Sequence, residues 1–185
     1  MAIVLDPVFL LIPPLVLAFL FGASCASKIR AWEEFVGVAQ NYRLLPRPLV
    51  RPVAYALPPI EGAVALGLLA SPSRRLAAIV AIALLAVFSA AVGVNLARGR
   101  RHIDCGCFRG VLRQPLSWWL LGRNGVLITL ALICVPDAAA ARALTWLDLV
   151  TVGGGTVALV LLLVAASSVL GPPPQPAVAL GDGVG

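Results

Sequence analysis

Two cysteines one residue apart mark the segment RGRRHIDCGCFRG, residues 98–110, as the part of the chain best suited to chemistry. Cys105 and Cys107 flank Gly106, and glycine gives the backbone the freedom that a ring closed across one residue demands. A disulfide in so short a ring should be strained, and strained, exposed disulfides are easily reduced. The spacing therefore favours a dithiol–disulfide redox pair.

The charged neighbours of the pair act in opposite directions. Arg100, Arg101 and Arg109 favour the thiolate form of a nearby cysteine, which is the nucleophile in disulfide exchange. Asp104, directly before Cys105, opposes them. The sequence thus predicts supporting roles for these side chains without fixing the net effect on the thiols.

Two other interpretations of the pair remain open. It can be two incidental small residues in a polar loop, or part of a metal site. The potential ligands are His102, Asp104, Cys105 and Cys107. Zinc sites usually take four ligands at wider spacing, so we expect no metal here.

Glu61 is the other residue that demands an explanation. It lies inside an apolar run, where a charge is costly and usually faces the interior of a helix bundle. Lys28 and Arg123, both near the ends of apolar runs, are its candidate partners. An interfacial position is the alternative, because Pro58-Pro59 can delay the start of the helix.

The elements that position these residues are apolar. The chain of 185 residues is 61% hydrophobic and 12% charged, against about 45–50% apolar residues in an ordinary soluble domain. Such a composition indicates an integral membrane protein. The net charge of +6 comes from Lys and Arg in the loops between apolar runs, as membrane topology signals do, so we expect no nucleic-acid partner.

We predict an all-α membrane protein, a small transmembrane bundle of about five spans in one domain, residues 1–170. The spans are 4–25, 53–69, 76–96, 118–134 and 146–170. A cleaved signal peptide is the competing interpretation of the first apolar run, in which Pro13-Pro14 predicts a kink. An amphipathic helix with Trp32 as an anchor should follow at the interface, and the Pro/Gly-rich tail 171–185 should be disordered.

Alternate crossing of the bilayer by these spans would bring three of the four cysteines to one side. The ends of the first and third spans face the same way, which places Cys25 with Cys105 and Cys107. Cys134, near the far end of the fourth span, belongs to the opposite side. Because a disulfide needs Cα atoms within about 7 Å, Cys25 is the better third thiol.

Four segments carry a resemblance to a known family. They are KIRAWEEF…YRLLP (28–46), LPPIEGAVALGLL (57–69), NLARGRRHIDCGCFRG (95–110) and GRNGVLITLAL (122–132). Together they resemble the MauE branch of the MauE/DoxX membrane proteins, although this chain reads Cys-Phe-Arg-Gly where the family usually reads Cys-Phe-Gly. The resemblance implies a DoxX-like four-helix core plus one helix. It also implies a thioredoxin-like partner and a role in maturing the disulfide-rich small subunit of methylamine dehydrogenase.

Charge and chemistry disagree about the side of the membrane. The loops and flanks on the cysteine side hold ten Lys and Arg and those on the other side three, which favours a cytoplasmic pair. Disulfides persist outside the cytoplasm, and the DoxX resemblance also places this side outside. Since arginines at the interface can snorkel, we favour the extracytoplasmic face of a bacterial cell membrane.

The predicted function is therefore that of a redox-associated membrane accessory protein, with its status as an enzyme left open. Its expected partners are the lipid bilayer and a thioredoxin-like or exported disulfide-containing protein. We expect no cofactor: a quinone would suit a membrane dithiol, but no residue identifies a quinone site. The alternatives are a non-catalytic assembly or docking factor with a structural cysteine pair, and a small-molecule carrier built around Glu61.

Overall fold

The computed structural model describes residues 3–100, 116–136, 138–140 and 142–170. Helices make up nearly all of this part of the chain. The elements are β1 Ile3–Leu5, α1 Pro7–Arg30, α2 Trp32–Asn41, α3 Arg47–Leu69, α4 Arg74–Ala97, α5 Trp118–Ile133, β2 Ala138–Ala140 and α6 Trp146–Leu170.

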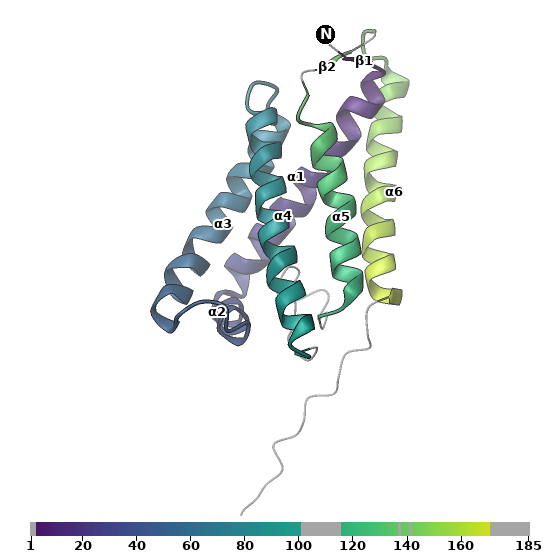
Figure 1. Cartoon of the computed structure of the whole chain (residues 1–185). Helices are drawn as coiled ribbons and strands as arrows, with labels where there is room; N and C mark the ends of the chain where they lie inside the picture. The colour runs from purple at the N-terminus through teal and green to yellow at the C-terminus, as the bar shows by residue number, and fades with distance from the viewer. Residues whose placement is uncertain (1–2, 101–115, 137, 141, 171–185) are drawn as a thin grey trace, which may run out of the picture.

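The long helices run alternately up and down in one bundle (Figure 1). The end of α1, the start of α3, the end of α4 and the start of α5 lie at the same end of the molecule, beside α2. We call this the α2 end. Because α4 ends and α5 begins at the α2 end, Arg100 and Leu116, which flank the segment 101–115, lie at this end as well. The predicted alternation of the helices is confirmed.

The core is formed around α1, which packs against α3, α5 and α6. Val16 and Leu17 of α1 are fully buried, and Leu68 of α3 and Ala78 of α4 meet them in the same apolar cluster. Asp6 caps α1 by accepting a hydrogen bond from the backbone N–H of Val8. The helix continues through Pro13-Pro14 as one element, so these prolines do not end it.

Four helices are long and apolar enough to cross a membrane: α1, α3, α4 and α6. The fifth, α5, is apolar but has only 16 residues. These helices fit a membrane protein and match the predicted set of apolar segments one for one. The number of true crossings and the DoxX-like core remain predictions.

The boundaries of α1 and α3 differ from those of the first two predicted spans. Helix α1 covers residues 7–30 rather than 4–25, because residues 3–5 form β1, which pairs in parallel with β2. Helix α3 begins at Arg47 rather than at residue 53. The first turn of a helix does not use the backbone N–H that proline lacks, so Pro48 is accommodated as the second residue of α3. The all-α prediction is correct except for these two short strands.

The amphipathic helix predicted after the first apolar run forms as α2. Its apolar side packs on α3, where Phe35 and Val36 are buried beside Ala54. The ring of Trp32 lies 4.2 Å from that of Tyr55, measured between centroids. Trp32 therefore contacts α3, a role that the prediction of a membrane anchor did not include.

An ion-pair cluster lies at the end of the molecule opposite α2. Arg142 donates to both carboxylate oxygens of Asp148 in α6, at 2.6 and 2.7 Å, and to Asp6 at 3.2 Å. Asp148 also accepts a hydrogen bond from the backbone N–H of Thr145, as in a capping box. Arg142 thus links the first turns of α1 and α6, the same two elements that β1 and β2 precede.

Candidate functional site

Cys25 lies in the seam between α1 and α3, five residues before the end of α1. At a rise of about 1.5 Å per residue, it sits roughly 8 Å from that end. Its side chain is a free thiol and partly exposed. A methyl group on Gly62 of α3 would lie 3.4 Å from the sulfur, so Cys25 packs directly against α3.

Cys134 is the other cysteine in the part of the chain that the structure describes, and it lies where the topology predicts. Cys134 follows α5 at the opposite end of the bundle and is a buried free thiol. Cys105 and Cys107 lie outside the described residues, as do Arg101, Asp104, Gly106 and Arg109. Their contacts stay predictions, but the segment that carries them is attached at the α2 end, toward which α1 runs from Cys25. Through its contact with Gly62, Cys25 lies beside a point about 22 Å along α3 from Arg47. Arg100, the last described residue before it, is partly buried.

One turn after Cys25, Lys28 forms a buried ion pair with Glu61 of α3. Its Nζ lies 2.7 and 2.8 Å from the two carboxylate oxygens. The two side chains are 3% and 1% exposed, so the pair is shielded from the surroundings of the bundle. Ser24 accepts a third hydrogen bond from Lys28 and donates one to Glu61 at 3.3 Å.

Two aromatic rings enclose the ammonium group. The centroids of Phe35 in α2 and Phe88 in α4 lie 5.4 and 5.7 Å from Nζ of Lys28. Both distances are within the range of a cation–π interaction. Four helices therefore contribute to a single charged site. Their counter-charge, hydroxyl group and aromatic rings together offset the cost of burying the ammonium group in an apolar bundle.

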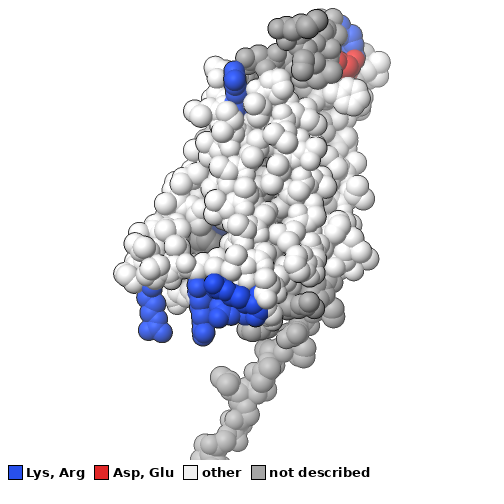
Figure 2. Space-filling model, viewed as in Figure 1, with Lys and Arg blue, Asp and Glu red and all other residues white. Residues whose placement is uncertain are grey.

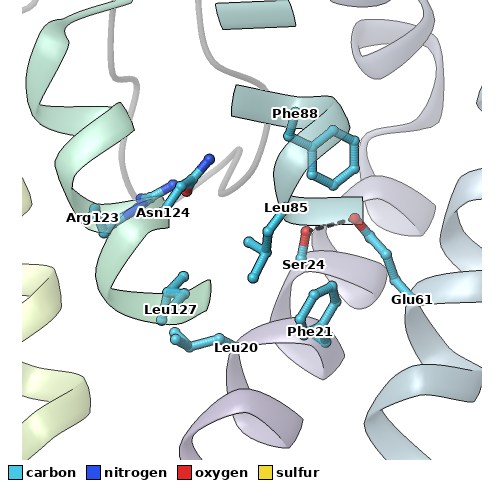
Figure 3. Close-up of a pocket in the computed structure, with 9 residues that line it drawn as sticks. All are labelled: Leu20, Phe21, Ser24, Glu61, Leu85, Phe88, Arg123, Asn124 and Leu127. Atoms are coloured by element: carbon cyan, nitrogen blue, oxygen red, sulfur yellow. Dashed lines mark hydrogen bonds between the residues drawn. The ribbon is translucent and has the colours of Figure 1, made fainter. Parts of the chain in front are cut away.

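A small cavity borders the ion pair (Figure 3). Ser24 and Glu61 lie on one side of it, while Arg123 and Asn124 of α5 lie on the other. Its volume of about 40 Å³ suits a few water molecules. The amide of Asn124 donates to Ser89 of α4 at 3.1 Å, which holds α5 against α4 beside the cavity.

The structure settles where Glu61 lies. It is buried rather than interfacial, because α3 begins six residues earlier than predicted and carries Glu61 well inside the helix. Lys28 is confirmed as its partner, and Arg123 is buried on the opposite wall of the same cavity. Sequence reasoning missed Ser24, although its position four residues before Lys28 places the two on one helix face. It also missed Phe88, whose position depends on the rotation of α4.

No metal centre is formed by the described residues, among which no three His, Cys, Asp or Glu side chains are grouped. The potential ligands named in the sequence, His102, Asp104 and the cysteine pair, lie outside them.

Comparison with known proteins gives one consistent result. Residues 6–137 match the family described as methylamine utilisation protein MauE. A protein of Paracoccus denitrificans with that name is 52% identical over 125 residues, which is 68% of this chain and 67% of the relative. One from Methylorubrum extorquens, with the same name, is 38% identical over 155 residues, 84% of this chain and 78% of the relative. No solved structure matches. The cysteine-bearing segment and the Lys28–Glu61 site both fall within the matched residues, and the chain belongs to the MauE family.

Proposed function

We propose that this protein is a membrane accessory of methylamine utilisation that exchanges disulfides with an exported partner through Cys105 and Cys107, with Cys25 as a third thiol. The family and the names of its relatives support the connection with methylamine. The observation that carries the chemistry is the position of Cys25. It is free and partly exposed in the second half of α1, which runs toward the end of the bundle from which the Cys105–Cys107 segment departs.

The proposed exchange needs no group beyond the thiols themselves. A thiolate of the reduced protein attacks the disulfide of the other, one S–S bond forms as one breaks, and the departing sulfur takes up a proton. The two proteins are then joined by a mixed disulfide, and attack by a second thiolate breaks this bond and separates them. One dithiol is then oxidised and the other disulfide reduced by the same two electrons, so either direction is balanced.

The ion pair has a supporting role in this proposal. Cys25 and Lys28 lie one turn apart in α1, and their contacts, Gly62 and Glu61, are neighbours in α3. The charge contacts therefore fix the seam in which the thiol lies. We infer that Lys28 and Glu61 position Cys25 and do not react themselves.

A carrier built around Glu61 is less well supported. The carboxylate is already bonded to Lys28 and Ser24, and a substrate would have to displace these contacts. The adjoining cavity of about 40 Å³ has room for a few water molecules and is far smaller than the clefts that hold drug-sized ligands.

The test is growth on methylamine of a bacterium whose own MauE protein has been replaced by this chain. A Cys105→Ser/Cys107→Ser variant should abolish growth and should no longer form mixed disulfides with thioredoxin-like or exported proteins. Cys134→Ser is the matched control and should grow normally, because that thiol lies at the other end of the bundle. Full growth of the double variant would refute the redox role.

The side of the membrane is tested in the same cells. A maleimide that cannot cross the membrane should label Cys107 in intact cells if the α2 end faces outward, as we propose. Labelling only after the cells are broken would place the pair in the cytoplasm.

A further inference from the structure

Exposed arginines gather at the α2 end of the molecule (Figure 2). The exposed members among the described residues are Arg30, Arg43, Arg47, Arg51 and Arg98. Glu33 and Glu34 of α2 are exposed at the same end, so the excess of charge there is positive. At the opposite end Arg142 is paired with two carboxylates, and Arg74 donates to the backbone carbonyl of Leu68.

Arg47 and Arg51 form the best-defined pair in this group. They lie four residues apart in the first two turns of α3, which places them on one helix face. Only Val50 and Ala54 are buried between residues 47 and 54, so this part of α3 projects from the bundle.

Large apolar side chains project from the same two turns. Leu49 is 50% exposed and Val53 is 40% exposed, on the face of α3 opposite the arginines. Tyr55, whose ring contacts that of Trp32, is 63% exposed one turn beyond Arg51 on the arginine side. Water hydrates the arginines, but exposure of these apolar side chains to water is unfavourable. The boundary between lipid headgroups and acyl chains satisfies both.

The length of α3 places the pair at that boundary. Arg51 and Arg47 lie 18 and 22 residues before Leu69, about 27 and 33 Å along the helix axis. The hydrocarbon layer is about 30 Å thick, so a helix that meets one headgroup layer at Leu69 brings this pair to the other.

We propose that Arg47 and Arg51 bind the phosphate group of an anionic phospholipid at the α2 end. Guanidinium groups bind phosphate oxygens in bidentate fashion, and Tyr55, four residues beyond Arg51 on the same side of α3, would contact an acyl chain of the same lipid. This site is separate from the proposed thiol exchange and does not depend on it.

The experiment is a titration of the delipidated full chain in detergent with dioctanoyl phosphatidylglycerol, followed by native mass spectrometry. Each Arg near a charged headgroup layer should contribute a factor of about five, so Arg47→Gln/Arg51→Gln should weaken binding about 30-fold. Arg47→Lys/Arg51→Lys keeps the charge and should retain most of the binding. Arg75→Gln is the matched control, an exposed arginine at the other end, and should bind as the unaltered chain does.

Four results would overturn the proposal. Unchanged phosphatidylglycerol binding by the Gln variant would remove the site, provided circular dichroism shows a folded protein. Equal binding of dioctanoyl phosphatidylcholine would show that the anionic headgroup is not recognised. Displacement of the lipid by millimolar inorganic phosphate would identify a site for free phosphate. Loss of a protein partner, with lipid binding intact, would show that the arginines serve a protein interface.

Discussion

Removing the charge of Glu61 should destabilise the bundle strongly. In Glu61→Gln the amide oxygen can still accept one hydrogen bond from Lys28, and Ser24 and the rings of Phe35 and Phe88 remain. The ammonium group nevertheless loses its counter-charge while 97% of its surface stays inaccessible. Breaking a buried ion pair from one side costs about 3–5 kcal/mol, and the remaining contacts favour the lower end, about 3 kcal/mol.

Thermal unfolding in a mild detergent would measure this effect. For a chain of this size each kcal/mol shifts Tm by about 2–4 °C, so the variant should melt about 6–12 °C lower. Ser24→Ala removes a hydroxyl but no charge and should cost about 1 kcal/mol.

The double variant Lys28→Met/Glu61→Met distinguishes pairing from simple packing. It removes both charges and fills the space with apolar side chains of similar volume, so most of the lost stability should return. The coupling free energy between the two positions should exceed about 2 kcal/mol. Additive losses, with the double variant less stable than either single one, would refute the ion pair as we describe it.

Two further predictions concern close packing and thiol exposure. Gly67→Ala should lower Tm by several degrees, because its methyl group would lie 2.9 Å from Cβ of Ala77. The control Gly93→Ala meets nothing within 4 Å and should be neutral or stabilising. Equal Tm values for the two variants would contradict the contact between α3 and α4. In detergent, maleimide should modify partly exposed Cys25 faster than buried Cys134, as peptide mass spectrometry would measure, and the reverse order would contradict their burial.

The helices that the sequence predicted best are those whose apolar runs are uninterrupted. Helix α6 has the predicted bounds, and α4 differs by one or two residues at each end. The predicted start of α3, residue 53, was wrong because Pro48 and Pro52 were interpreted as helix breakers. Proline at the start of a helix costs little, and α3 accommodates three more prolines within it, Pro52, Pro58 and Pro59.

Other features depend on contacts between distant parts of the chain. The strand pair β1–β2 joins residues more than 130 positions apart, and the segment Ala138–Ala140 has no pattern that signals a strand. Lys28 was one of two candidate partners predicted for Glu61, because a charge in an apolar run requires a partner, and the structure pairs Glu61 with Lys28. The contacts of Phe88 with that pair could not be predicted, since they depend on how α4 is rotated in the bundle.

The disulfide state of Cys25 tests the central claim most directly. The purified protein would be equilibrated over a range of glutathione potentials, blocked with an alkylating reagent, digested and mapped by mass spectrometry without reduction. Our account predicts a fraction in which Cys25 is linked to Cys105 or Cys107, and no linkage to Cys134, which lies at the other end of the bundle. A Cys25 that stays a free thiol at every potential, or that pairs with Cys134, would contradict it.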